Sequence, residues 1–264
     1  MNNLISSFDK ILEFAQTQGV PPEKKRGILR EYLQSKFLSL LYGLKNSNKL
    51  SFVGGTALRL LRNADRFSED LDFDNLGLSD HEIRELVEEI VRVFAVENIV
   101  VELRSAITEG KTYYDLRFPD VLEALKITTN QREKLMIKVD YSDHWKGQAP
   151  LPVLLNKYGF VQSVVTNPIN QLLVQKLAAY SQRKMMQPRD VYDIVWLFSQ
   201  GARIDREFAE ANSLEYLLAN AIERHIKEGV NESFKNKLAP FLFNPADTKK
   251  LDLFESVLNE LKNL

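Results

Sequence analysis

Two aspartates in an alternating segment, downstream of a glycine turn, constrain this chain most. Residues 70–73 read Asp-Leu-Asp-Phe, and Gly54 and Gly55 stand upstream, directly after an apolar run. In a β-strand successive side chains point to opposite faces. Asp70 and Asp72 therefore share one face, while the two apolar residues of the segment point into a core. The segment predicts a half-buried strand that carries two carboxylates on its open face.

The spacing of these carboxylates indicates a site for a divalent cation. Like charges about 6–7 Å apart repel each other, and a cation between them removes the repulsion. Oxygen ligands alone suit Mg²⁺ or Mn²⁺. The turn at Gly54 and Gly55 lets backbone N–H groups approach an anion at the start of a helix, and Thr56 adds a hydroxyl. A phosphate cradle beside metal carboxylates is suited to phosphoryl or nucleotidyl transfer. The alternative is a surface turn followed by a solvated edge strand.

A third carboxylate fits the same pattern. Residues 136–140 alternate again, so Lys138 and Asp140 share a face. A strand next to the first one would bring Asp140 to the same metals, whereas the alternative is an ordinary half-exposed strand. Asp74 has the right parity too, but Asn75 and Gly77 indicate that the strand has ended before it.

Composition excludes several classes of protein. The 264 residues contain no cysteine, which excludes disulfides, cysteine-ligated zinc, iron–sulfur clusters and a thiol nucleophile. The net charge of −1 excludes a histone-like basic protein, although local basic patches stay open. No apolar run is long enough for a transmembrane helix, and the N-terminus lacks the basic start of a signal peptide. We therefore expect a soluble cytoplasmic protein with no membrane association.

The chain divides into an α/β part and a helical part. Alternating segments and helical periods mix up to about residue 150, and almost everything after Asn167-Pro168 has helical period. We expect strands at 50–53, 70–73, 99–103, 113–118 and 135–141, and helices at 56–62, 79–97, 168–183, 189–199, 214–227 and 249–263. A capping box of Ser79 and Glu82 opens the second helix.

The glycine turn and the acidic strand together resemble a known family. Gly-Gly-Thr-Ala-Leu at 54–58, followed by Arg-Phe-Ser-Glu-Asp-Leu-Asp-Phe at 66–73, is similar to the AbiEii/MenT nucleotidyltransferase toxins of the DNA polymerase β-like superfamily. The resemblance implies an α/β (α+β) fold: a polymerase β-like nucleotidyltransferase domain with a mixed sheet, followed by a helical C-terminal domain. Residues 1–155 would form the first, with its N-terminal helices, and residues 156–264 the second, completing the nucleotide cleft.

Two later motifs extend the resemblance. Lys176 lies on an apolar helix face, where an anion or carboxylate partner or simple snorkelling would explain it. Residues 189–193 read Arg-Asp-x-x-Asp at a helix start, where acids also favour the helix dipole. By resemblance, Lys176 binds the triphosphate and Asp193 orients that lysine or the substrate. Lys176, Arg183, Lys184 and Arg189 form either a patch for triphosphate or RNA, or a solvated helix end.

The resemblance, joined to the pattern of residues, assigns roles. The expected catalytic residues are Asp70, Asp72, Asp140, Lys176 and Asp193. The metal ligands among them are Asp70, Asp72 and Asp140, holding Mg²⁺ or Mn²⁺, with Asp140 sharing a metal or acting as general base. The expected nucleotide-binding residues are Gly54, Gly55, Thr56, Arg66, Ser68, Lys176 and Arg189. For Ser68 the alternative is that its hydroxyl braces the turn.

The expected reaction is attack of an acceptor hydroxyl on the α-phosphate of an NTP, with release of pyrophosphate. By resemblance the acceptor is the 3′ end of tRNA, and the protein is the toxin of a toxin–antitoxin or abortive-infection system, neutralised by a cognate antitoxin. One alternative keeps the enzyme but changes the acceptor to a small molecule, such as an aminoglycoside, or to a protein hydroxyl. The other is a catalytically idle, partner-binding member of the fold.

Overall fold

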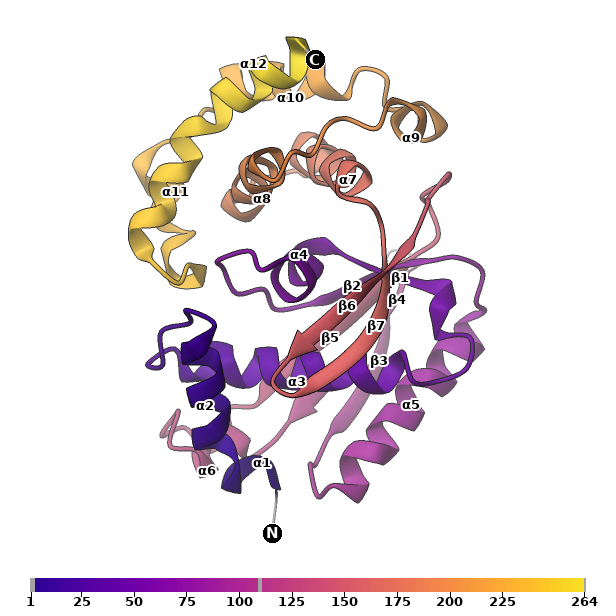
Figure 1. The fold of residues 1–264 in the computed structure, drawn as a ribbon, viewed down its shortest axis with the longest axis vertical. Helices are drawn as coiled ribbons and strands as arrows, with labels where there is room; N and C mark the ends of the chain where they lie inside the picture. The colour runs from indigo at the N-terminus through magenta and orange to yellow at the C-terminus, as the bar shows by residue number, and fades with distance from the viewer. Residues whose placement is uncertain (1–2, 109–110, 264) are drawn as a thin grey trace. The chain divides into compact units, whose positions relative to one another are not determined.

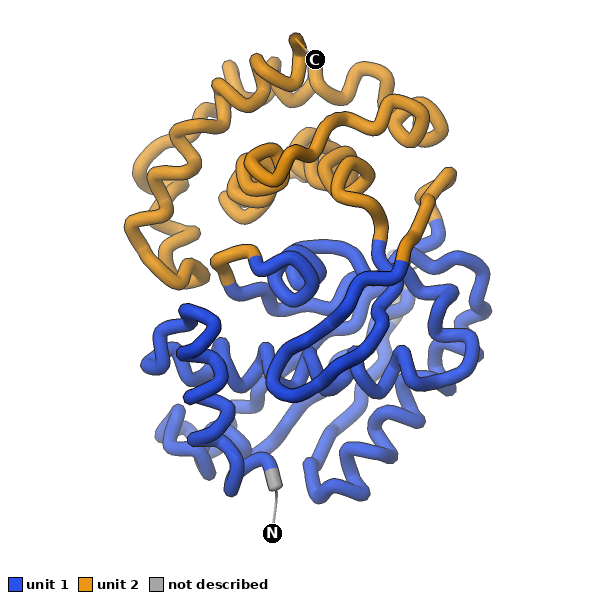
Figure 2. The backbone as a smooth tube through the Cα atoms, viewed as in Figure 1, with its two compact units in different colours: residues 1–63, 67–143, 152–166 blue, residues 64–66, 144–151, 167–264 orange. Residues whose placement is uncertain are grey.

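The computed structural model describes residues 3–108 and 111–263, and the chain forms two compact units (Figure 2). Unit 1 comprises residues 1–63, 67–143 and 152–166, and unit 2 comprises residues 64–66, 144–151 and 167–264. Two short pieces of chain that precede residue 167, residues 64–66 and 144–151, therefore belong to the mainly C-terminal unit. Among the described residues, no helix has both the length and the apolar character that crossing a bilayer requires.

The centre of unit 1 is a five-stranded mixed sheet with the order β1-β2-β5-β4-β3 (Figure 1). Its strands are β1 (Leu50–Val53), β2 (Leu71–Asn75), β3 (Glu102–Thr108), β4 (Lys111–Phe118) and β5 (Leu135–Ser142). The pair β2–β5 is parallel, and β1–β2, β4–β5 and β3–β4 are antiparallel. The parallel pair brings two segments together that are more than sixty residues apart in the sequence.

Helices cover the apolar face of this sheet. The helices of unit 1 are α1 (Asn3–Ser6), α2 (Phe8–Thr17), α3 (Lys25–Leu41), η1 (Ser47–Lys49), α4 (Gly54–Arg62), α5 (Asp80–Val96) and α6 (Val121–Ala124). Phe37 of α3 and Val87 of α5 meet Phe73 and Val139 of the sheet around one small apolar space. Because side chains alternate along a strand, the residues between these buried positions lie on the opposite face.

A separate two-stranded hairpin completes unit 1. It consists of β6 (Leu151–Lys157) and β7 (Phe160–Thr166). Tyr158 and Gly159 make the two-residue turn, and both have positive φ, of 52° and 82°. Such a turn matches the twist of a hairpin. The Thr166 hydroxyl donates to the Phe52 carbonyl at 2.5 Å, which ties the hairpin to β1.

Unit 2 is helical. Its helices are α7 (Ile169–Gln182), α8 (Pro188–Ser199), α9 (Arg206–Ala211), α10 (Leu217–Glu228), α11 (Glu232–Asn236), η2 (Ala239–Phe241), η3 (Pro245–Leu253) and α12 (Phe254–Asn263). Backbone contacts join the short stretch 64–66 to this unit. Arg66 forms a β-bridge with Leu242, and the Phe243 N–H donates to the Asp65 carbonyl at 3.2 Å.

The structure confirms the predicted fold class, a mixed α/β region followed by helices. The capping box is present: the Ser79 hydroxyl accepts from the Glu82 N–H, and the Glu82 carboxylate accepts from the Ser79 N–H. Two predictions were wrong in detail, and one element was missed. Residues 99–101 are not a strand, because Ile99 closes the end of α5 by donating to the Phe94 carbonyl. Residues 249–253 are 3-10 rather than α-helical, and the hairpin β6–β7 was not predicted.

A buried polar network stabilises the contact between α3, α4 and the hairpin. The Arg59 guanidinium donates to both carboxylate oxygens of Glu31, at 2.7 and 3.0 Å, and the Tyr158 hydroxyl donates to the same carboxylate at 2.9 Å. Lys157 lies nearby, 3% exposed, and among the described residues it donates only to the side-chain oxygens of Asn63 and Gln18. Burial, helped by the Arg59 charge, lowers the pKa of Lys157 to about 8.

We expect Lys157→Met to stabilise unit 1 at pH 7 by about 1–3 kcal/mol, because it removes a buried charge without a carboxylate partner. The wild-type free energy of unfolding should rise from pH 8 to pH 9.5, since the unfolded chain still binds the proton that folded Lys157 has released. Hydrogen exchange of unit 1 amides across this pH range measures both effects. Lys45→Met, at an exposed position of the same unit, should change neither. If the free energy of unfolding of Lys157→Met rose from pH 8 to pH 9.5 as in the wild type, Lys157 would not be the group that causes this rise.

Candidate functional site

Asp72 and Asp140 lie directly opposite each other in unit 1. Asp72 is in β2, Asp140 is in β5, and the parallel register pairs them. Both side chains are half-buried, whereas Leu71 and Val139, one position earlier, are buried on the other face of the sheet. The register therefore places two carboxylates side by side on the open face, as the alternation of each segment predicted.

The predicted strand began at Asp70, but β2 begins at Leu71. Asp70 therefore lies one residue before the strand. Its backbone is fixed by Thr56, whose hydroxyl donates to the Asp70 carbonyl at 2.5 Å. Thr56 is fully buried. In this structure the threonine hydroxyl therefore holds the acidic segment in place.

Gly54 is required by the position of Asp72. Val53, the residue before it, pairs with Asp72 across β1 and β2. Gly54 has a φ of +76°, and a Cβ at this position would collide with the Asp72 carboxylate. Only glycine combines this backbone conformation with so close an approach. The glycine turn and the acidic strand, which the sequence separates, thus meet at one carboxylate. Helix α4 begins at Gly54 and includes the buried Gly55 in its first turn, two residues before the predicted start.

Lys138 places a positive charge on this face. Its ammonium donates to an Asp140 carboxylate oxygen at 2.6 Å and lies 4.3 Å from the centre of the Tyr113 ring. Burial alone would lower the pKa of Lys138, but the hydrogen bond and the charge of Asp140, together with Asp70, hold it above its usual value. Across residues 3–108 and 111–263, no three acidic or histidine side chains converge as a metal site in this arrangement. Lys138 is bound to Asp140, which is one of the expected metal ligands.

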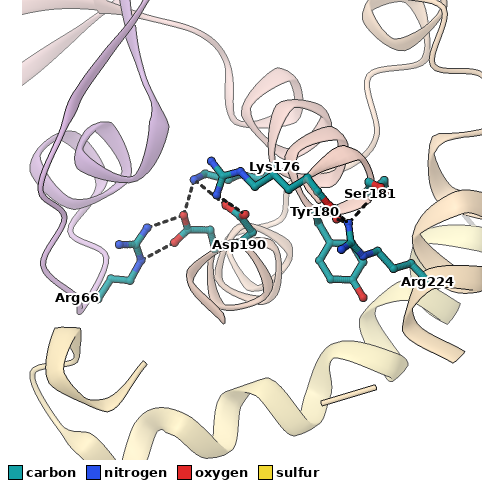
Figure 3. A network of polar contacts seen from close by, with 8 residues as sticks. Arg66, Lys176, Tyr180, Ser181, Asp190 and Arg224 are labelled. Atoms are coloured by element: carbon teal, nitrogen blue, oxygen red, sulfur yellow. Dashed lines mark hydrogen bonds and ion pairs between the residues drawn. The ribbon is translucent and has the colours of Figure 1, made fainter. Parts of the chain in front are cut away.

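A second cluster lies in unit 2 around the carboxylates of Asp190 and Asp193; Figure 3 labels Arg66, Lys176 and Asp190 of this cluster. The Arg66 guanidinium donates to both carboxylate oxygens of Asp193, at 2.7 and 2.6 Å. The Lys176 ammonium lies 2.8 Å from the same carboxylate and 3.6 Å from that of Asp190. Asp193 is fully buried, Arg66 nearly so, and the side chain of Lys176 is 14% exposed. Arg66 thus contacts the protein's own carboxylate in this structure.

Charge compensation favours the ionised form of Asp193 in this buried cluster. Burial alone would raise the pKa of Asp193, but the charges and hydrogen bonds of Arg66 and Lys176 hold it below its usual value. Asp190, which is also buried, receives a further hydrogen bond from Arg183 at 2.7 Å. Asp190 and Asp193 on α8 therefore bind Lys176 of α7 and Arg183 at its C-terminal end.

Two further predicted residues, Ser68 and Arg189, make other contacts. Ser68 is half-buried, and its backbone carbonyl accepts from Gln34 at 3.2 Å. Arg189 lies over the ring of Phe241, 5.0 Å from its centre. The structure thus brings Gly54, Asp72 and Asp140 together in unit 1. It brings Arg66, Lys176 and Asp193 together in unit 2.

Sequence reasoning missed three features of these clusters. Asp74 lies within β2, which continues to Asn75, and its side chain is 1% exposed. Strand parity predicted the face of Asp74, but Asn75 and Gly77 were read as the end of the strand, so Asp74 was left out of it. The same parity placed Lys138 beside Asp140 but did not predict that they form an ion pair. The pair of Arg183 and Asp190 had no sequence signal beyond opposite charge.

Comparison with known proteins identifies the family. The profile described as "Nucleotidyl transferase AbiEii toxin, Type IV TA system" matches residues 39–259. The chain belongs to the AbiEii nucleotidyltransferase toxin family. It is thus a nucleotidyltransferase toxin of the type IV toxin–antitoxin class, which implies an NTP substrate and an antitoxin partner. No curated protein sequence matches this AbiEii chain.

Solved structures share the fold of this AbiEii chain at low sequence identity. The nucleotidyltransferase toxin MenT4 of Mycobacterium tuberculosis aligns with a TM-score of 0.62 and 18% identity, over 97% of this chain and 90% of MenT4. The protein JHP933 of Helicobacter pylori aligns with a TM-score of 0.50 and 16% identity, over 90% of this chain and 94% of JHP933. The similarity extends over nearly the whole chain in each case.

We expect Asp193→Asn to lower the free energy of unfolding of unit 2 by about 3–5 kcal/mol, because it leaves two cations facing a neutral amide in a buried site. The pKa of Asp193 lies below its usual value, so its contribution is present above about pH 4 and is lost as the pH falls below that. The variant should therefore lose less stability than the wild type on further acidification.

Urea unfolding followed by tryptophan fluorescence measures this effect, since Trp145 and Trp196 both belong to unit 2. Glu232→Gln, which removes an exposed partner of Lys235, should cause little change. Equal losses in the two variants would contradict the assigned importance of the buried cluster.

Proposed function

We propose that this protein transfers a nucleoside monophosphate from an NTP to the 3′ end of tRNA in the cytoplasm, in a reaction that depends on Mg²⁺ or Mn²⁺. The observation that carries the proposal is the contact of the Gly54 turn with Asp72, directly opposite Asp140. A backbone that approaches a carboxylate this closely, at the start of a helix, places N–H groups that can bind phosphate beside carboxylates that can bind a metal. The family supplies the class of reaction.

The donor set fits a hard divalent cation. Asp72 and Asp140 offer carboxylate oxygens from adjacent strands, and Asp70 immediately precedes one of them. Oxygen ligands of this kind are the ones that Mg²⁺ and Mn²⁺ prefer. Lys138 occupies one oxygen of the Asp140 carboxylate, so its ammonium competes with a metal cation for that group. When bound, the cation supplies Lewis-acid stabilisation of the charge that develops on the phosphates.

The residues of unit 1 divide the remaining tasks. The N–H groups of Gly54 and Gly55, at the first turn of α4, are proposed to bind phosphate oxygens, and Ser68 is a further proposed contact. Thr56 supports the site by fixing the backbone of Asp70. Asp140 shares the cation or accepts the proton of the acceptor hydroxyl. The hydroxyl oxygen then bonds to the α-phosphorus, and the bond from that phosphorus to pyrophosphate breaks.

The residues of unit 2 are proposed to act on the triphosphate. Lys176 would neutralise part of its charge, and Asp193 and Asp190 hold the lysine in place through the contacts of the buried cluster. Arg66 is proposed to contribute by fixing Asp193 rather than by reaching a phosphate itself, because its guanidinium is buried. Arg189, at the start of α8, remains a proposed nucleotide contact.

We expect Asp72→Asn to reduce transfer about a hundredfold or more while leaving the fold intact, because it removes one negative charge from the proposed metal site. The assay incubates the protein with Mg²⁺, each of four α-³²P-labelled NTPs in turn and total tRNA. Asp143→Asn, at an exposed position just after β5, is the matched control and should retain activity. Label on tRNA with wild type and control alone supports the proposal.

Other outcomes contradict it specifically. Label on a protein or on an added aminoglycoside, with none on tRNA, would replace the acceptor and keep the enzyme. Absence of NTP binding would point to a catalytically idle, partner-binding member of the fold. Full transfer by Asp72→Asn would remove this residue from the reaction.

We expect Lys138→Met to bind Mn²⁺ about tenfold more tightly in the absence of NTP. The substitution removes the cation that competes for Asp140 and leaves its carboxylate facing that of Asp72. Electron paramagnetic resonance of free Mn²⁺ measures the affinity without reference to activity. Lys134→Met, which breaks an exposed pair with Glu102, is the matched control and should leave Mn²⁺ affinity unchanged. Equal affinities in Lys138→Met and the wild type would contradict competition between lysine and metal.

A further inference from the structure

Unit 2 contains a hollow of about 530 Å³ that the reaction described above does not use. It lies between the C-terminal end of α7 and helix α10, together with the residues just before α10. We call it the α7–α10 hollow, and the residues that matter to its chemistry are Ser181, Arg183, Lys184, Tyr216, Arg224 and Lys227. All of them belong to unit 2.

Arg224 gives the α7–α10 hollow a fixed wall. One nitrogen of its guanidinium donates to the carbonyls of Tyr180 and Arg183, both at 2.6 Å, and to that of Ser181 at 3.2 Å (Figure 3). Another nitrogen donates to Glu228 at 2.9 Å. These bonds close the last turn of α7, whose carbonyls have no partners within the helix. The shape of the hollow is therefore set before any ligand binds.

The hollow carries an excess of uncompensated positive charge. Lys184 and Lys227 have no ion pair or hydrogen bond with any described residue. Arg183 is 49% exposed and donates one nitrogen to Asp190, which leaves its other N–H groups open to a ligand. Of the two carboxylates in the lining, that of Glu228 is bound by Arg224, and only Glu223 opposes the cations. An anionic ligand is therefore favoured over a cationic one.

Two further features narrow the chemistry of the ligand. Tyr216 is 75% exposed, so its ring offers a flat face beside the lysines. The Oγ of Ser181 is shielded from solvent and has no hydrogen-bond partner among the described residues. An exposed aromatic ring among cations is the arrangement that binds single-stranded nucleic acid, where bases stack and phosphates pair with lysines. An unsatisfied hydroxyl adds a donor for a phosphate or sugar oxygen.

We propose that the α7–α10 hollow binds a single-stranded polynucleotide, with one base stacked on Tyr216 and its phosphates held by Lys184 and Lys227. Arg183 connects this hollow to the buried cluster, because Asp190 contacts both Arg183 and Lys176. That the bound strand is the unpaired end of the acceptor RNA rests on the proposed function. Binding itself does not, since it needs neither metal nor NTP.

The test is fluorescence anisotropy of the full-length protein with a labelled ten-nucleotide single-stranded RNA, without metal or NTP. The variant with Lys184→Ala and Lys227→Ala together should bind about tenfold more weakly. The slope of the logarithm of affinity against that of salt should fall by about 1.4, the value for two lost phosphate contacts on a single strand. Tyr216→Ala should also weaken binding about tenfold, whereas Tyr216→Phe keeps the stacking face and should stay within about twofold of the wild type.

The matched control carries Lys10→Ala and Lys25→Ala, which remove the same charge from exposed positions of unit 1. It should bind RNA like the wild type. An equal loss in this control would show nonspecific charge attraction and overturn the proposal. Unchanged affinity in both hollow variants would overturn it as well, even if the protein transfers nucleotides to tRNA.

The source of the strand is separated by two further probes. A single-stranded DNA of the same sequence that binds equally well supports a site for bases and phosphates. Weaker DNA binding supports an added contact to the 2′-hydroxyl. A duplex that competes as strongly as the single strand would overturn the stacking on Tyr216. Binding at the hollow without transfer to tRNA would leave this inference standing and refute the proposed acceptor.

Discussion

The repulsion between Asp72 and Asp140 is the constraint on which unit 1 depends. Opposite positions on adjacent strands bring their side chains close together, and both carboxylates are half-shielded from water. A structure that keeps two negative charges this close needs a positive charge beside them. Lys138 provides it here, and the glycine at position 54 is required because Asp72 fills the space that a side chain would take. The geometry of the site thus follows from one unfavourable pair and its compensation.

Unit 2 also holds buried charge, but there two cations surround one carboxylate. Asp193 is fully buried, and two cations neutralise it from different parts of the chain. The arginine binds through two nitrogens of its planar guanidinium, which fixes the carboxylate, while the lysine is a point charge on a flexible stem. This division explains how Lys176 can stay partly accessible while the rest of the cluster is sealed from solvent.

Much of the fold and the composition of both clusters were predictable from the sequence. Alternation predicted the faces of β2 and β5, and the capping box predicted the start of α5. The register that pairs Asp72 with Asp140 was not predictable, because it depends on contacts between segments far apart in the chain. The hairpin β6–β7 was missed because its turn, Tyr158-Gly159, lacks the usual Asn-Gly or Asp-Gly signal, and because Pro152 disfavours a strand.

The roles of single residues were harder to predict than their neighbourhoods. Arg66 stood in the motif as a phosphate contact, yet its side chain is buried against Asp193. Thr56 stood there as a phosphate ligand, yet its hydroxyl bonds to the backbone of Asp70. Sequence spacing indicates which residues gather, but hydrogen-bond partners depend on burial and rotamers that only the folded chain fixes.

The position of residues 64–66 has a consequence for the order in which the chain folds. This short stretch emerges from the ribosome long before α7 and α8, yet its arginine completes the buried cluster of unit 2. A fragment that begins at residue 167 lacks this charge, so its Asp193 would be compensated by Lys176 alone. Unit 2 is therefore not an independent module that could be cut away or transplanted as one contiguous piece. During synthesis Arg66 cannot pair with Asp193 until more than a hundred further residues have been made.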